Sequence, residues 1–164
     1  MQAYRKDTVY PLALNEKFSI ELILRPHEKQ GTYAHVIGNH PGYNYFEGFV
    51  IQQDGDKQNV YTFGFGNGKE WLPPVRFRLT AEEWNYLAIV VKNNQIGVYK
   101  NGFLLTSGDA GDSIKNSEMP IWIGNWVNHD RPFKGKIYGA RIFNHSLSES
   151  DIRRNWERIK EKLM

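Results

Sequence analysis

Cysteine is absent from this 164-residue chain, so neither disulfide bonds nor thiol chemistry can hold its fold or carry its function. Long apolar runs are absent as well, and no stretch approaches the roughly 20 residues that a membrane-spanning helix needs. The opening residues, MQAYRKDTVYPLALNEKF, lack the apolar core of a signal peptide. We therefore expect a soluble protein with no membrane partner. Its location stays unknown, with an extracellular or cell-surface place expected if it was excised from a longer chain.

An excess of one charge sign is also lacking. Lys and Arg number 21 against 18 Asp and Glu, which gives a formal net charge of +3. The densest basic group, residues 153–162, is interleaved with Glu157 and Glu161. Nucleic-acid-binding proteins instead concentrate Lys and Arg on one face. The charge pattern thus indicates ordinary solubility and predicts no nucleic-acid partner.

The chain does have a globular composition, 40% hydrophobic and 14% aromatic, and its length suits one domain over residues 1–164. Residues 18–26, FSIELILRP, alternate apolar and polar side chains as a half-buried strand does. Asn101-Gly102 is a strong hairpin signal between two further strands. In full, strands are predicted at 18–26, 35–39, 48–53, 59–66, 75–79, 84–92, 95–100, 103–107, 120–125 and 136–144.

Short strands separated by turn signals indicate an all-β protein in which two antiparallel sheets form a sandwich. One α-helix is predicted to close the chain. Ser148 is a suitable N-cap, and Asp151 three residues later completes a variant of the capping box. Apolar side chains then recur on one helical stripe, which should pack against the sandwich: Ile152, Trp156, Ile159 and Leu163.

Three segments together resemble the laminin-G-like domains of the concanavalin A-like lectin/glucanase superfamily. FSIELILRP resembles their opening strand, EEWNYLAIVVKNNQIGVYKNGFLL their central hairpin, and PIWIGNW…FKGKIYGARIFNHSLSESDI their closing segment. The resemblance covers most of residues 15–156. It implies a jelly-roll sandwich with one concave sheet, where ligands usually meet the concave face or the loops at one rim. It implies no single function, because this fold carries lectins, adhesion modules and glycan hydrolases.

Catalysis by paired carboxylates is not predicted. Glycan hydrolases need two such groups about 5 to 9.5 Å apart, and related hydrolases place them on one strand. No predicted strand carries two acidic side chains on one face with that spacing, and helix capping explains the Glu149 and Asp151 pair. We expect no catalytic residues and no enzyme. A lyase that uses His, Tyr, Arg and Gln is left open as a further alternative.

Metal binding has little support in the residue spacing. The five histidines show no zinc-ligand pattern. Calcium needs several converging oxygens, and Asn125, Asn128 and Asp130 share one loop. The resemblance weakens a calcium site, however, because Tyr138 and Gly139 stand where relatives commonly have Asp and Glu. We expect no cofactor, with calcium at this loop as the alternative.

Aromatic and planar polar side chains gather in two loops, and these are the groups with which proteins bind glycans. Trp126 is the expected stacking platform, exposed at the rim, because a loop aromatic is costly to leave exposed without use. Trp122 could cover the concave face or lie under the helix. The other candidates are Asn125, Asn128, His129, Asp130 and Arg131, then His40, Tyr43 and Tyr45, and Trp71.

The prediction is a non-catalytic, lectin-like carbohydrate-binding module that recognises a glycan or polysaccharide. The alternative is a protein-interaction or adhesion module, in which the same rim contacts another chain. Each candidate also has a structural explanation: the polar residues could form turns, and Trp71, which precedes a Pro-Pro pair, could simply anchor a loop.

Overall fold

The computed structural model describes residues 14, 16–42 and 44–163. Within that part of the chain it has ten strands and one helix. In chain order they are β1 (Lys17–Pro26), β2 (His35–Gly38), β3 (Phe49–Gln53), β4 (Val60–Gly66), β5 (Trp71–Arg78), β6 (Asn85–Lys92), β7 (Gln95–Lys100), β8 (Phe103–Asp109), β9 (Trp122–Ile123), β10 (Gly135–Phe143) and α1 (Glu149–Leu163).

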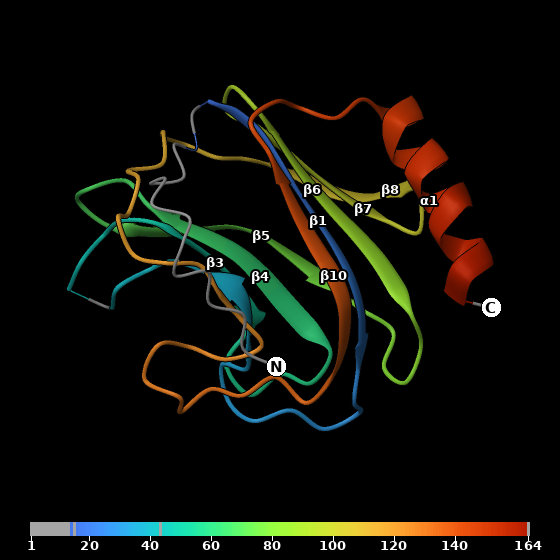
Figure 1. Cartoon of the computed structure of the whole chain (residues 1–164). Helices are drawn as coiled ribbons and strands as arrows, with labels where there is room; N and C mark the ends of the chain where they lie inside the picture. The colour runs from blue at the N-terminus through green and yellow to red at the C-terminus, as the bar shows by residue number, and fades with distance from the viewer. Residues whose placement is uncertain (1–13, 15, 43, 164) are drawn as a thin grey trace.

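The strands form two antiparallel sheets of five, which pack face to face as a jelly-roll sandwich (Figure 1). Sheet A has the order β10-β1-β6-β7-β8, and sheet B has the order β5-β4-β3-β2-β9. The predicted all-β architecture with one C-terminal helix is therefore confirmed. The hairpin turns follow the sequence signals, since Asn101 and Gly102 have φ angles of 51° and 86°.

The core lies between the sheets and follows the period-two pattern of the strands. In β1, Phe18, Ile20, Leu22 and Leu24 are at most 2% exposed, and all belong to one apolar cluster. Sheet B contributes the alternate positions of its own strands to the same cluster, among them the aromatic ring of Phe63. One contiguous core holds the two sheets together.

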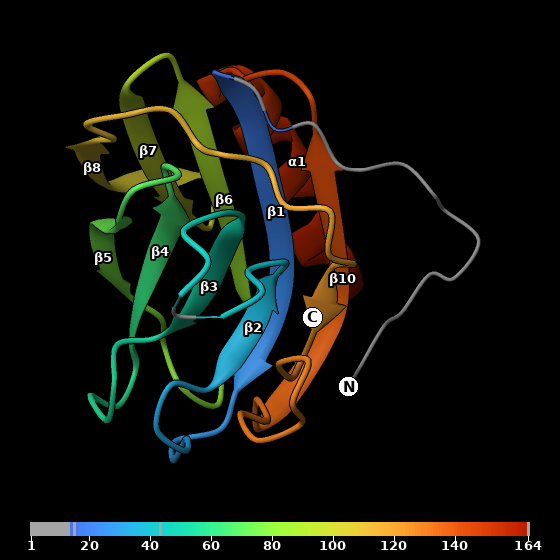
Figure 2. The same ribbon diagram turned by 90° about the vertical axis from the view of Figure 1, so that its left-hand side faces the viewer.

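The helix α1 covers the outer face of sheet A (Figure 2). Its predicted N-cap is confirmed, because Asp151 N donates to Ser148 Oγ at 3.1 Å and Ser148 N donates to Asp151 Oδ2 at 3.3 Å. Ile152 is fully buried and Trp156 stacks on Tyr86 at 6.2 Å between ring centroids. The helix is neither long nor apolar enough to cross a membrane.

Two strands differ from the sequence prediction. The strand β5 begins at Trp71 and runs through Pro73-Pro74, whereas the prediction began it at Val75. Two prolines are tolerated there because β5 is the edge of sheet B, where backbone N–H groups on the open side need no strand partner. The strand β9 is only two residues long, because Gly124 adopts a φ of 82° and turns the chain out of the sheet.

Candidate functional site

The outer face of sheet B is floored by a row of residues that pair across four strands. Trp122 of β9 pairs with Gly38 of β2, which pairs with Val50 of β3, which in turn pairs with Gly64 of β4. Directly paired residues of antiparallel strands share one face of the sheet. Neighbouring positions such as Ile123 pack against the core. Trp122 therefore faces outward from sheet B and does not lie under α1, which decides between the two predicted placements.

A second row on the same face is polar. His35 of β2 pairs with Gln52, Gln52 with Thr62, and Thr62 with Arg76 of β5. His35 is fully buried, and its Nε2 donates to the carbonyl oxygen of Trp122 at 3.0 Å. Buried His35 Nδ1 and Gln52 Oε1 have no hydrogen-bond partner among the described residues. In native structures such atoms are usually satisfied by water or by a ligand.

Trp71 stands over the far end of the first row. A Cβ atom built on Gly64 would lie 3.0 Å from Trp71 Nε1, so the absence of a side chain at Gly64 makes room for the indole. Trp71 and Trp122 are both half-buried. Because adjacent strands lie about 4.8 Å apart, the three steps from Trp122 to Gly64 span roughly 14 Å of the face. Two partly exposed indoles thus stand at the two ends of a row of small residues, and Gly38, Val50 and Gly64 between them are buried.

Trp126, the predicted platform, is buried, and the prediction of an exposed indole at the rim is wrong. Its side chain is only 6% exposed, and its Nε1 donates to the carbonyl oxygen of His40 at 3.1 Å. The ring stacks on His40 with centroids 5.1 Å apart, and the guanidinium of Arg131 covers it at 4.5 Å. His40, 7% exposed, also contacts Trp71 at 5.4 Å. The sequence argument failed because a loop aromatic can be covered by residues far away in the chain.

The rest of the loop 125–131 divides into folding and exposed residues. Asn125 Oδ1 accepts the backbone N–H groups of Trp126 and Arg131 at 2.8 and 3.0 Å, so Asn125 shapes the loop. His129 has a φ of 60° and lies edge-on to Trp122 at 5.5 Å. Asn128 and Asp130 are exposed. Among the residues of this loop, His129 is the one whose ring lies beside the half-buried indole of Trp122.

The predicted site residues in the stretch 38–49 differ in their relation to the candidate site. His40 belongs to the stack described above, but it supports the face from within. Tyr45 is 62% exposed, and Tyr43 lies outside the described residues. His35 and Gln52 were not among the predicted site residues. The signal that could have found them is a polar side chain at an outward-facing position of a predicted strand that is otherwise mostly apolar.

Both buried histidines are held neutral. The pKa of His35 is lowered to about 4 by burial, which outweighs the opposing hydrogen bond to Trp122, and the nearby Arg131 charge acts in the same direction as burial. Burial, then the charges of His35 and Arg131, lower the pKa of His40 to about 3. The face therefore offers neutral imidazoles at physiological pH, which are suited to hydrogen bonding with hydroxyl groups.

The described residues offer no metal centre. No group of three or more His, Cys, Asp or Glu side chains among them is placed to hold a metal ion. Asp54 is the acidic residue beside the polar row, and it bonds to Arg76 at 3.0 Å and Lys57 at 3.3 Å. Burial opposes its ionisation, but these two hydrogen bonds hold the pKa of Asp54 below its usual value. A carboxylate held ionised in this way is unsuited to act as a general acid.

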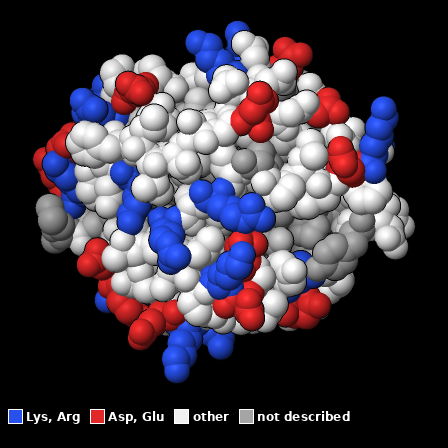
Figure 3. Space-filling model, turned by 180° about the vertical axis from the view of Figure 1, so that it is seen from behind, with Lys and Arg blue, Asp and Glu red and all other residues white. Residues whose placement is uncertain are grey.

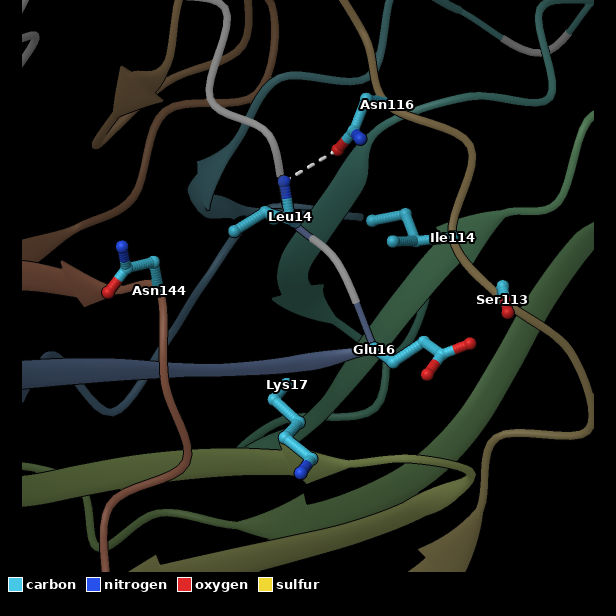
Figure 4. A pocket seen from close by; sticks show the side chains of 7 residues that line it. All are labelled: Leu14, Glu16, Lys17, Ser113, Ile114, Asn116 and Asn144. Atoms are coloured by element: carbon cyan, nitrogen blue, oxygen red, sulfur yellow. Dashed lines mark hydrogen bonds between the residues drawn. The ribbon is translucent and has the colours of Figure 1, made fainter.

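A cavity of about 550 Å³ lies at the edge of the sandwich near the start of β1 (Figure 4). Leu14 N donates to Asn116 Oδ1 at 2.8 Å beside it, and Lys17, Ile114 and Asn144 are among its lining residues. No aromatic ring lines it within the described chain. On the face in Figure 3, Lys and Arg side chains are interspersed with Asp and Glu. We therefore place the candidate site on sheet B.

The family model Laminin_G_3, described as the concanavalin A-like lectin/glucanases superfamily, matches residues 6–153. The chain belongs to this superfamily. Membership agrees with the jelly-roll sandwich and confirms the resemblance seen in the strand and hairpin segments. Comparison with curated protein sequences gives no match.

Solved structures similar to this superfamily member include domain 4 of AbnA, an extracellular GH43 arabinanase from Geobacillus stearothermophilus, in complex with arabinotriose. It is 21% identical with a TM-score of 0.66, over 94% of this chain and 80% of that one. The botulinum neurotoxin serotype G binding domain is 17% identical with a TM-score of 0.67, over 96% and 40%. The binding domain of botulinum neurotoxin DC, in complex with rat synaptotagmin II, is 16% identical with a TM-score of 0.70, also over 96% and 40%.

The chain thus spans less than half the length of the toxin binding domains that it matches. At these identities the likeness to solved structures shows a shared fold. It places the chain among structures that include carbohydrate-binding and receptor-binding domains.

Proposed function

We propose that this chain is a non-catalytic glycan-binding module and that it binds its ligand on the outer face of sheet B. The observation that carries the proposal is the pair of half-buried indoles, Trp71 and Trp122, which are the partly exposed rings at opposite ends of the buried Gly38–Val50–Gly64 row. Indole faces provide rigid apolar area for the C–H faces of sugar rings, and they lose little conformational entropy on binding. A span of roughly 14 Å suits an oligosaccharide better than a monosaccharide.

The polar row beside the indoles supplies the directional groups that sugar hydroxyls require. Arg76 is exposed and presents its guanidinium beside the indoles, whereas Gln52 is half-buried with its Oε1 atom inaccessible. His35 and His40 lie beneath the surface and are neutral at pH 7. A buried water would satisfy the unpaired nitrogen atoms His35 Nδ1 and His40 Nε2, and such a water could in turn bridge to a bound hydroxyl.

The comparisons support the proposal without carrying it. One similar structure holds arabinotriose, and this chain covers 80% of that domain. Another is a binding domain in complex with a protein, synaptotagmin II, which keeps a protein ligand as the alternative.

A glycan array that includes plant and bacterial polysaccharides, with and without a calcium chelator, tests the proposal. We expect retention of at least one glycan class, unchanged by the chelator. Trp71→Ala and Trp122→Ala should each weaken retention about tenfold, since a stacking aromatic contributes on the order of 1.5 kcal/mol. Trp84→Ala is the matched control, because Trp84 is half-buried against Tyr138 of β10 in sheet A.

If Trp84→Ala loses as much glycan retention as the Trp71 and Trp122 variants, the binding site is not on sheet B. An array with no retained glycan, measured on protein with an intact circular dichroism spectrum, would contradict glycan binding and favour a protein ligand.

A further inference from the structure

A second hollow lies on the opposite side of the sandwich, between α1 and β10, and has a volume of about 400 Å³. We call it the α1–β10 groove. Its sheet-side wall includes Ile23, Ala140 and Gly139. A Cβ atom built on Gly139 would meet nothing within 4 Å, so the groove is open above this residue. Pockets of this size hold small ligands or short peptide segments.

The buried acid in the groove is already used by the fold. Glu21 is 2% exposed, and its carboxylate accepts hydrogen bonds from Tyr86 OH and, at 2.9 Å, from Asn155 Nδ2. Arg141 Nη2 lies 2.7 Å from its other oxygen. Burial, and then the hydrogen bond to Glu21, raise the pKa of Tyr86 well above its usual value, so the hydroxyl stays a donor. This network ties α1 to sheet A and leaves Glu21 no role in binding a cation.

Two cations on α1 face the same groove and have no such partner. Arg158 and Lys162 line it, are exposed, and form no ion pair with the described residues. Of the other cations of the helix, Arg154 pairs with Asp151 and Lys160 with Glu157, while Arg153 lies over the ring of Phe103. With Arg141 the lining residues carry three positive charges against the single negative charge of Glu21. The groove therefore favours an anionic ligand.

The shape of the opening indicates an extended chain. Residues four apart on a helix lie on one face and are about 6 Å apart along its axis. In an extended strand, alternate side chains lie on one face about 6.7 Å apart, which is nearly the same spacing. Within the described residues β10 pairs only with β1, so no described strand occupies its other edge, and strand edges of this kind can pair with a further strand. Tyr138, 62% exposed on β10, adds apolar area at the mouth.

We infer that the α1–β10 groove docks an extended acidic segment of a partner protein. The segment adds as a strand to the free edge of β10 and directs alternate carboxylates toward Arg158 and Lys162. This interaction is separate from the glycan-binding face on sheet B, so one molecule can bind both ligands at once.

A fluorescently labelled octapeptide of alternating Glu and Val tests the inference by anisotropy with the full chain at low salt. We expect saturable binding that weakens as salt is added, because the contacting charges are exposed. The same peptide with Lys in place of Glu should not bind. A peptide with Pro in place of alternate Val should bind poorly, because proline cannot donate to a strand ladder.

The double variant Arg158→Glu with Lys162→Glu should weaken binding about tenfold or more. The matched control, Arg153→Glu with Arg154→Glu, makes the same change in net charge at exposed positions of α1 outside the groove and should bind like the parent. Gly139→Leu fills the groove without meeting another atom at its Cβ, so it should abolish binding at an unchanged melting temperature.

The inference is overturned if the control pair loses binding as much as the groove pair, or if Gly139→Leu binds normally. It is also overturned if the acidic peptide does not bind while a labelled polyuronate does, with the polyuronate lost in the Arg158→Glu, Lys162→Glu variant. Retention on the glycan array, with its Trp71 and Trp122 variants, reports on the other face independently.

Discussion

His35 and His40 are buried at the outer face of sheet B as neutral imidazoles. Their burial makes the stability of the fold sensitive to acid. Burial is the main cause that lowers their pKa values from 6.5 to about 4 for His35, against an opposing hydrogen bond to Trp122, and to about 3 for His40. In the unfolded chain both rings take up a proton below pH 6.5, whereas in the folded chain they do so only near pH 4 and below. Their contribution to stability is therefore complete above pH 6.5 and is lost as the pH falls from there toward the folded-state values.

The size of the loss follows from proton linkage. Each histidine contributes a slope of about 1.4 kcal/mol per pH unit between its two pKa values. From pH 7.5 to pH 5 this amounts to about 2 kcal/mol for each ring and about 4 kcal/mol for the pair. Both side chains are almost inaccessible to solvent, 0% for His35 and 7% for His40. A loss of this size is a large share of the 5–15 kcal/mol that is typical of folded domains.

Urea denaturation at pH 7.5 and at pH 5 measures this loss directly. In His40→Gln one titrating ring is gone, so the free energy of unfolding should fall by only about 2 kcal/mol between the two pH values. His145→Gln is the control, because His145 is exposed, and it should keep the parental loss of about 4 kcal/mol. If the parent and His40→Gln lose the same free energy on acidification, the buried histidine is not the cause and the reasoning is refuted.

Three further predictions concern packing. Trp126→Ala should lower the free energy of unfolding by about 3–5 kcal/mol in urea denaturation, because it empties a buried site and leaves the His40 carbonyl oxygen without the indole donor; a loss under about 1 kcal/mol would contradict its burial. Gly64→Val should displace the Trp71 indole, which changes tryptophan fluorescence and weakens glycan retention, whereas Gly31→Val, with nothing within 4 Å of its Cβ, should change neither. Ser148→Ala removes the N-cap of α1 and should cost about 1 kcal/mol in thermal unfolding without altering glycan retention.

Local patterns explain how much of the fold was predictable. Alternation in FSIELILRP identified the inward-facing side chains of β1, and Asn101-Gly102 located a hairpin turn, because both signals depend on neighbouring residues alone. The start of β5 was missed for the opposite reason. Pro73-Pro74 normally argues against a strand, and only the position of β5 at the edge of sheet B makes the prolines acceptable.

The sequence identified a loop that lies beside the candidate site, and it did not identify the roles of the residues in that loop. The loop containing Trp126 does lie against the proposed binding face. The indole, however, is covered by His40, which is 86 residues away in sequence, and by the guanidinium of Arg131. No periodicity within the loop encodes a contact of that range. The half-buried indoles that replace it as candidates are Trp71 and Trp122.

The sequence by itself determined the strands, the capped helix and the sandwich, because each of these depends on the spacing of apolar, turn-forming and capping residues along a short stretch. Only the tertiary structure decided which face carries the candidate site. The sheet order places Trp122 beside Gly38 of a strand far earlier in the chain and leaves α1 on the opposite side of the sandwich. That pairing sets which aromatic rings meet solvent, and long-range strand order is not written in any local pattern.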